Sequence, residues 1–422
     1  MPFQVALIAA LLKVALILGS TLLVVPMLVW LERKLIAAFQ ARIGPDRVGK
    51  FGLLQSFVDG IKLVCKEEVV PNGVDRLLYF AGPVVTMIPA LTVGALIPFG
   101  PPVKIGGYTH DLVMSDLPVG ALFVLAITSL GVYGIVLSGW SSNNKYSLLG
   151  GLRASAQMVS YELPMGLCVV AALMIASQDS PTGVFSMRFS EIVDAQSGTI
   201  LNWTAFNYHF PLLGLLAMVV FYICGLAETN RAPFDLPEAE TELIGGYHTE
   251  YGGLRWAMFF MGEYAAMLNV ASVTATLFLG GWRPPYPSPL PAGSVLAGFE
   301  GAFWLVFKIG LVILLYMWIR ATLPRLRYDQ LMGFGWKILI PVGLLNIFLI
   351  AGILTFAFPE KAPSVLVPAT TSASSPAPPP SSMPGGMGGI QQLQIPGGAG
   401  PAPTAPPVAP SPAPGAPGVG GR

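Results

Sequence analysis

Long apolar runs alternate with short polar connections along most of this 422-residue chain, and charges, prolines or glycines end each run. A helix needs about 20 apolar residues to cross a bilayer. The runs predict eight spans, at residues 5–31, 77–98, 117–139, 157–177, 211–227, 256–279, 302–323 and 336–358. We therefore expect an all-α polytopic membrane protein with a single membrane domain, residues 1–358.

The pattern changes abruptly after the last apolar run. Residues 359–422 consist mainly of Pro, Ala, Gly and Ser, with stretches such as SSPAPPPSSMPGG. A segment of this kind has little apolar surface to bury, so it does not form a packed core. We expect a disordered tail outside the membrane.

The connection after the first span contains a helical pattern of its own, at about residues 51–68. Apolar residues recur there at helical spacing, and polar residues fall on the opposite face: Leu54, Phe57, Val58, Ile61, Val64 and Cys65 against Gln55, Asp59, Lys62 and Lys66. The spacing predicts a cytoplasmic-side amphipathic helix at the membrane surface. Two interpretations stay open, an interfacial anchor and the lip of an opening for a lipid-soluble molecule.

The distribution of positive charge predicts the orientation of the chain. The connections after spans 1, 3, 5 and 7, counted with Arg320 and Lys337 at the adjoining span ends, hold sixteen Lys and Arg, whereas the opposite side holds five. Positive residues concentrate on the cytoplasmic side of membrane proteins. Both termini are therefore expected to face outward. Hydrophobic residues make up 54% of the chain and its net charge is +1, a composition that suits a lipid bilayer and gives no sign of nucleic acid binding.

The sequence offers few side chains that could bind an iron–sulfur cluster or a metal ion. The three cysteines, Cys65, Cys168 and Cys224, are far apart and form no Cys-x-x-Cys pair, which excludes a cysteine-held iron–sulfur cluster on this chain alone. The three histidines are scattered, so no metal site is expected. No Gly-rich dinucleotide turn is present either. We expect this chain to bind no cofactor by itself.

Four ionisable residues fall in or near the predicted spans, namely Lys13, Glu162, Glu263 and Lys308. A charge at the bilayer centre costs roughly 2.5–3.5 kcal/mol on insertion scales, so such residues usually face a bundle interior or a hydrated path. Lys13 is expected to anchor a helix end. Glu162 and Glu263 fit a proton path, and the alternative is a structural ion pair of such an acid with Lys308.

The connection ETNRAPFDLPEAETELIGGYHTEY, residues 228–251, places six carboxylates around Arg231. Asp235 and Glu238 have the spacing of a helix N-cap and its third residue. This leaves Glu228, Glu240, Glu242 and Glu250 unexplained. Crowded carboxylates between spans would titrate as a coupled set with raised pKa values, which suits proton handling. A solvated acidic face is the alternative.

Four stretches closely resemble the H subunits of bacterial proton-pumping NADH:quinone oxidoreductases and their mitochondrial counterpart. They are LERKLIAAFQARIGPDRVGKFGLLQSFVDGIKLVCKE, GLRASAQMVSYELP, AETNRAPFDLPEAETELIGGYHTEY and RATLPRLRYDQLMGFGWK, and the similarity covers roughly residues 20–340. The resemblance implies a multi-pass subunit of the bacterial inner membrane that forms part of a quinone chamber at the junction with the peripheral arm. The resemblance further implies that the subunit couples reduction of ubiquinone or menaquinone to proton translocation.

The resemblance also implies partners and residue roles. The partners are the peripheral-arm quinone-site subunits and small membrane subunits, with FMN and iron–sulfur clusters carried by partner subunits. The implied quinone chamber and its opening use Glu32, Arg33, Arg42, Asp59, Lys62 and Arg231. Proton coupling uses Glu228, Asp235, Glu238, Glu240, Glu242, Glu250, Glu162 and Glu263. Docking to neighbouring subunits is expected of Arg320, Arg325, Arg327 and Asp329.

Two other protein classes share some of these features. A membrane subunit of an energy-converting hydrogenase has parts of the first and acidic connections, but delivers electrons to protons without a quinone. The intact RIGPDRVG and RAPFDLPEAETEL stretches, with eight spans, favour the quinone enzyme. A free-standing ion transporter with an intramembrane carboxylate is the other alternative, and it would be active when expressed alone.

Overall fold

A computed structural model describes residues 3–105, 108–179, 186–235, 244–291 and 293–357. The chain divides into two units, Met1–Val365 and Leu366–Arg422. The second unit lies outside the described residues, as does the whole segment predicted to be a disordered tail, so the character of that tail stays a prediction.

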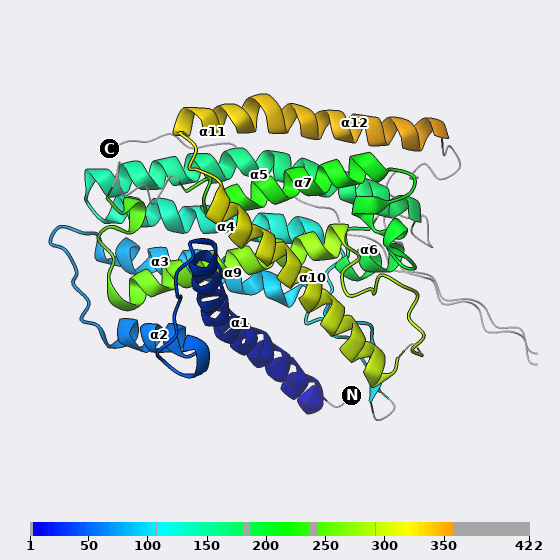
Figure 1. Cartoon of the computed structure of the whole chain (residues 1–422), viewed down its shortest axis with the longest axis horizontal. Helices are drawn as coiled ribbons and strands as arrows, with labels where there is room; N and C mark the ends of the chain where they lie inside the picture. Colours follow the sequence, from blue (N-terminus) through cyan, green and yellow to red (C-terminus); the bar gives the residue numbers. More distant parts are fainter. Residues whose placement is uncertain (1–2, 106–107, 180–185, 236–243, 292, 358–422) are drawn as a thin grey trace, which may run out of the picture. The chain divides into compact units, whose positions relative to one another are not determined.

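The described residues are mostly helical (Figure 1). The helices are α1 (Phe3–Phe39), α2 (Gln55–Cys65), α3 (Arg76–Thr92), α4 (Gly120–Ser141), α5 (Lys145–Asp179), α6 (Phe189–Ala195), α7 (Pro211–Glu228), α9 (Gly253–Phe278), α10 (Val295–Thr322), α11 (Tyr328–Phe334) and α12 (Ile340–Ala357). Short helical turns are η1 (Lys50–Gly52), η2 (Val93–Ala95), η3 (Ile200–Asn202), η4 (Thr204–Phe206), η5 (Gly246–His248) and the π-turn η6 (Gly335–Leu339). Strands β1 (Val103–Ile105) and β2 (Tyr108–His110) form one antiparallel hairpin.

The long helices pack as a bundle around a shared apolar core. Helices α3, α4, α5, α7 and α9 run roughly alongside one another, α12 lies along α5, and α1 and α10 cross the others at a slant (Figure 1). Glycines allow the closest approaches: a Cβ at Gly134 of α4 would lie 2.7 Å from the backbone nitrogen of Thr86 in α3. A Cβ at Gly139 would lie 2.7 Å from the carbonyl oxygen of Ser147 in α5. Small residues at such crossings let helix backbones meet.

Seven helices in the described residues are long and apolar enough to cross a membrane. They are Leu11–Phe39, Arg76–Ala95, Gly120–Ser141, Lys145–Gln178, Pro211–Glu228, Val295–Thr322 and Tyr328–Ala357. The structure thus agrees with a polytopic membrane protein. The remaining predicted span, residues 256–279, corresponds to α9, which has 26 residues and is not among the seven. The count of eight spans therefore stays a prediction.

Helix α9 is more polar than the seven candidate spans because it lies inside the bundle. Nearly all of its second half is buried. There the Asn269 amide donates to the Ala90 carbonyl at 2.6 Å, and the hydroxyls of Thr274 and Thr276 donate to carbonyls one turn earlier, each at 2.7 Å. Buried polar groups are tolerated when they are hydrogen-bonded in this way. Little of this half of α9 is left to face lipid.

The amphipathic stretch forms α2, which packs against α1 and α9. Its apolar residues Val58, Ile61 and Val64 are 45%, 64% and 62% exposed. An exposed apolar row on one helix suits a membrane surface or a partner. Its placement at the membrane, and the choice between anchor and lip, stay predictions.

The two lysines of the spans both bind backbone carbonyls. Buried Lys308 donates to the carbonyls of Gly281, at 2.9 Å, and Arg283, at 2.6 Å, and its ammonium lies 4.0 Å from the centroid of the Trp203 ring. These partners follow the C-terminal end of α9, so Lys308 binds carbonyls here and does not form the ion pair with an intramembrane acid that was the alternative interpretation. Lys13 donates to two carbonyls of the connection after β2, at 3.1 and 3.0 Å, as suits a helix-end anchor.

Candidate functional site

An open cavity of about 860 Å³ lies where α1 and α10 approach the first part of α9. Five of its described lining residues are arginines and two are acids: Arg33, Arg42, Arg47, Arg231 and Arg320 against Glu32 and Asp46. Several other lining residues are apolar, from α1 and the connection that follows it. A cavity with more positive than negative side chains attracts an anion, and its volume lies within the range of small-molecule sites. We call it the arginine cavity.

Glu32 of α1 joins three helices at the wall of the arginine cavity. Its side chain is almost fully buried, and buried carboxylates need charged or hydrogen-bonding partners. Arg320 of α10 forms an ion pair with it, and the Tyr264 hydroxyl of α9 donates to it at 2.9 Å. Both partners also line the cavity. The structure places Arg320 in this wall, and its predicted docking role stays a prediction.

Arg231 is held between aromatic rings and a carboxylate. Its guanidinium carbon lies 4.3 Å from the centroid of Tyr264 and 5.6 Å from that of Phe260. Its Nη2 lies 3.3 Å from the Oε2 of Glu263. Phe260, Glu263 and Tyr264 occupy one face of α9, at positions i, i+3 and i+4. Arg231 and Glu263 are only 5% and 8% exposed, so water screens their attraction little.

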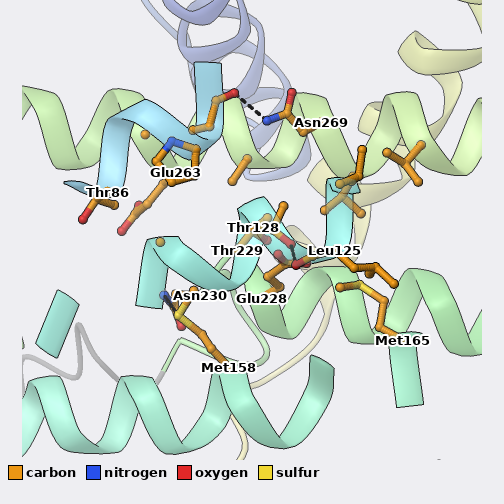
Figure 2. Close-up of a pocket in the computed structure, with 18 of the residues that line it drawn as sticks. Thr86, Leu125, Thr128, Met158, Met165, Glu228, Thr229, Asn230, Glu263 and Asn269 are labelled. Atoms are coloured by element: carbon orange, nitrogen blue, oxygen red, sulfur yellow. Dashed lines mark hydrogen bonds between the residues drawn. The ribbon is translucent and has the colours of Figure 1, made fainter. Parts of the chain in front are cut away.

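Glu263 faces a second, smaller cavity inside the bundle, which we call the inner cavity. Its volume is about 80 Å³, and it is lined mainly by residues of α3, α4, α5, α7 and α9. Figure 2 shows Glu228 and Glu263 on its wall, together with Thr86 and Asn230. The hydroxyl of Tyr247, in η5, donates to the Oε1 of Glu263 at 2.9 Å. The Arg231–Glu263 pair therefore has one member on each cavity.

Two further carboxylates, Glu228 and Glu162, belong to the helices around the inner cavity. Glu228 ends α7 beside Thr128 (Figure 2). It also interacts electrostatically with Glu162 of α5. The Ser129 hydroxyl of α4 donates to Glu162. The sequence placed these acids on a path from the cytoplasmic connections into the membrane. In the structure they stand near one another on three packed helices.

Both ends of the acidic connection are fixed to the bundle. The Gln157 amide of α5 donates to the carbonyls of Ala227 and Phe234, each at 2.8 Å. Asp235 forms an ion pair with Arg325 at 2.8 Å. At the far end, the Asn144 amide donates to Glu250 at 2.6 Å. The residue that follows Glu250 is Tyr251, and burial raises the pKa of its hydroxyl.

Glu238, Glu240 and Glu242 lie outside the described residues, which include 228–235 and 244–251 of this connection. The predicted helix cap at Asp235 and Glu238, and the coupled titration of the six acids, therefore stay predictions.

The remaining predicted residues lie mostly at the surface. Arg33 pairs with Asp59 at 2.9 Å, which brings Asp59 to the edge of the arginine cavity. Lys62 is exposed on α2 and is not among the residues that line the cavity. Arg327 and Asp329 are exposed near the start of α11, and their predicted docking role stays a prediction.

The NADH dehydrogenase family has a sequence profile that matches residues 12–351. The chain belongs to this family. Its relatives include an NADH-quinone oxidoreductase H subunit, numbered 1, of Solibacter usitatus (strain Ellin6076), 44% identical over 82% of this chain and 96% of its own length. An H subunit numbered 2, of Koribacter versatilis (strain Ellin345), is 46% identical over the same shares. The H subunit of Protochlamydia amoebophila (strain UWE25) is 47% identical over 76% and 90%. The family assignment confirms the resemblance drawn from the four sequence stretches.

Sequence reasoning missed three aromatic residues of the site. Phe260 and Tyr264 carried a usable signal, since they lie three residues before and one after Glu263 on the same helix. Tyr247 carried none, because it reaches Glu263 from an irregular connection whose path the sequence does not reveal. The arginine and the acids were predicted, and Arg231 was expected to hold carboxylates, but its pairing with Glu263 in particular was not predicted.

Proposed function

We propose that this chain is the H subunit of a proton-translocating NADH:quinone oxidoreductase of the bacterial inner membrane, with both termini outward. In this role it forms part of the quinone chamber at the junction with the peripheral arm. It then couples quinone reduction to proton movement. The name shared by its relatives and the charge of the arginine cavity both support this proposal.

Quinone reduction fits the chemistry of the arginine cavity. A quinone that accepts two electrons gains negative charge until two protons neutralise it, and guanidinium groups stabilise that charge. FMN and the iron–sulfur clusters that supply the electrons belong to partner subunits in this proposal. The apolar residues of the cavity suit the quinone ring and tail. The cavity thus provides binding and charge stabilisation, without redox groups of its own.

The observation that carries the coupling proposal is the Arg231–Glu263 pair between the two cavities. Negative charge on a reduced quinone competes with Glu263 for the Arg231 guanidinium. A Glu263 carboxylate that loses this partner gains affinity for a proton. The proton then passes between Glu263 and Glu228 in the inner cavity, on to Glu162, which interacts electrostatically with Glu228, and, in the assembled complex, toward the neighbouring membrane subunits. Charge in one cavity is thereby converted into proton movement in the other.

Substituting Glu263→Gln in the assembled complex tests this mechanism. The amide keeps the size of the side chain but cannot carry the proton, so we expect NADH-driven proton pumping to fall about a hundredfold, at the lower end of what a positioned acid–base group contributes. Quinone reduction should fall with it. The measurements are quenching of a pH-sensitive dye in vesicles and the rate of NADH oxidation with quinone.

Two controls separate the mechanism from simple misassembly. NADH oxidation with ferricyanide needs only the partner subunits and should stay normal. Glu191→Gln, an exposed acid at the start of α6, should leave pumping unchanged. Wild-type pumping in Glu263→Gln would refute the coupling role. Hydrogen evolution in place of quinone reduction would instead favour the energy-converting hydrogenase.

A further inference from the structure

An apolar groove of about 610 Å³ lies away from both cavities, between the ends of α7 and α10 and the start of the α11–α12 segment. Its lining is almost entirely carbon, from residues such as Ile223, Leu226, Leu323 and Ile338. Leu323 and Ile338 are each 50% exposed. These residues belong to, or directly follow, three of the candidate membrane spans. An exposed apolar surface on such spans suits contact with lipid tails.

Positive and interfacial residues are close sequence neighbours of residues that line the groove. Arg325 and Arg327 stand on either side of Leu326, which lines it, and Lys337 precedes Ile338. All three cations are exposed. Trp336 is 53% exposed, and its Nε1 donates to the Ser160 hydroxyl at 3.2 Å. Tryptophan and cations of this kind mark the headgroup level of a bilayer.

We propose that the groove binds an anionic phospholipid of the cytoplasmic leaflet. One acyl chain fills the apolar channel, and the phosphate group binds Arg327 and Lys337 at its rim. Arg325 contributes less, because Asp235 already neutralises it at 2.8 Å. The cytoplasmic leaflet carries the anionic lipids, and basic sites between helices on that side bind their headgroups. A partner helix would instead need polar or small side chains for close packing, and the lining offers few.

The site is joined to the acidic connection by direct contacts. Phe234 lines the groove, and its carbonyl accepts the Gln157 amide at 2.8 Å. The backbone nitrogen of Leu326 donates to the Pro233 carbonyl at 3.1 Å. A lipid in the groove therefore packs against the residues that fix the first part of the connection. This inference goes beyond the proposed function, since binding can be measured on the resting complex without turnover.

The test measures lipid binding to the intact purified complex in nanodiscs of phosphatidylcholine with increasing phosphatidylglycerol. Native mass spectrometry counts the phosphatidylglycerol molecules that stay bound. In the double variant Arg327→Gln with Lys337→Gln, the tightest site should bind phosphatidylglycerol about twenty-five-fold more weakly, because each cation near the surface contributes about a factor of five. Leu323→Trp, which fills the groove, should lose the same bound molecule.

A matched double variant at the cytoplasmic ends of other helices serves as the control. Arg76→Gln with Lys145→Gln removes two exposed cations that do not line the groove, so binding should stay as in the wild type. Equal phosphatidylglycerol binding in all variants would overturn the proposal, as would equal binding of phosphatidylcholine at this site. Loss of neighbouring subunits in Leu323→Trp would overturn it in favour of a protein interface. A raised KM for long-tailed quinones in phosphatidylcholine alone would overturn it in favour of a quinone site.

Discussion

The surroundings of Arg231 select for the planar shape of its guanidinium group as well as for its positive charge. It lies against the Tyr264 and Phe260 rings while it pairs with Glu263. A planar guanidinium can stack on rings and keep its ion pair at the same time, whereas an ammonium on a flexible stem cannot do both. The position therefore demands arginine specifically, and a change that preserves the charge still has a cost.

Arg231→Lys should lower kcat/KM for quinone about tenfold, since a desolvated cation–π contact is worth about 1–2 kcal/mol. Steady-state kinetics with one soluble quinone measures this. Arg42→Lys is the control, because Arg42 lines the same cavity but is exposed, so its effect should be slight. Equal losses in both variants would mean that the stacked geometry is unimportant.

The sequence predicted the acids of the site better than their partners. Glu162 and Glu263 were visible because a carboxylate inside an apolar run is costly and therefore conspicuous. The contact between Glu32 and Arg320 joins residues that lie 288 positions apart in the sequence. No local spacing encodes such a contact. It depends on how α1 and α10 cross.

At the scale of elements, the position of Tyr247 depends on two glycines. A Cβ on Gly150 of α5 would lie 2.7 Å from the Cα of Gly246, the first residue of η5. Only glycine at residue 150 lets η5 approach α5 so closely. That approach places the neighbouring Tyr247 within reach of Glu263. Gly150 has no reactive side chain, yet its small size thus sets the position of Tyr247 at the inner cavity.

Gly150→Ala should destabilise the subunit by about 1–3 kcal/mol, as overpacking does, and should also slow proton pumping by moving Tyr247. Gly166→Ala is the matched control on the same helix, where a Cβ would meet nothing within 4 Å. There alanine should be neutral or stabilising, because it lowers the entropy lost on folding. Thermal unfolding of the complex and dye-based pumping assays measure both effects. Unchanged pumping in Gly150→Ala would separate Tyr247 from the mechanism.

Element prediction from the sequence was best where helices face lipid and weakest where they do not. Seven predicted spans match helices that are apolar enough to cross a membrane. Helix α9 was also predicted, but its Asn269, Thr274 and Thr276 lower its hydropathy because they bond within the bundle. High hydropathy marks the apolar side chains that face lipid. Helix α9 is mostly buried among other helices, so its hydropathy is a weaker indication of a membrane span.

On the scale of the whole molecule, the two ends of α9 serve different purposes. The first part carries Phe260, Glu263 and Tyr264 between the two cavities. Beyond the other end, Lys308 binds the carbonyls of Gly281 and Arg283. The sequence offered an acid as an alternative partner of Lys308, because side chains can be read from the sequence, whereas the direction of a loop's backbone carbonyls cannot. Its role is to hold that loop against α10.

Lys308→Met should therefore reduce the amount of assembled complex without changing the protons pumped per NADH oxidised. The change leaves two carbonyls without their donor, and a buried unsatisfied group costs about 1–3 kcal/mol. Lys13→Met is the matched control: it removes the same kind of donor from two carbonyls, but Lys13 is partly exposed and water can replace it. Quantitative native gels and the ratio of pumping to NADH oxidation distinguish the outcomes. A lowered ratio in Lys308→Met would place Lys308 on the proton path, and equal assembly of the two variants would show that burial of the donor is unimportant.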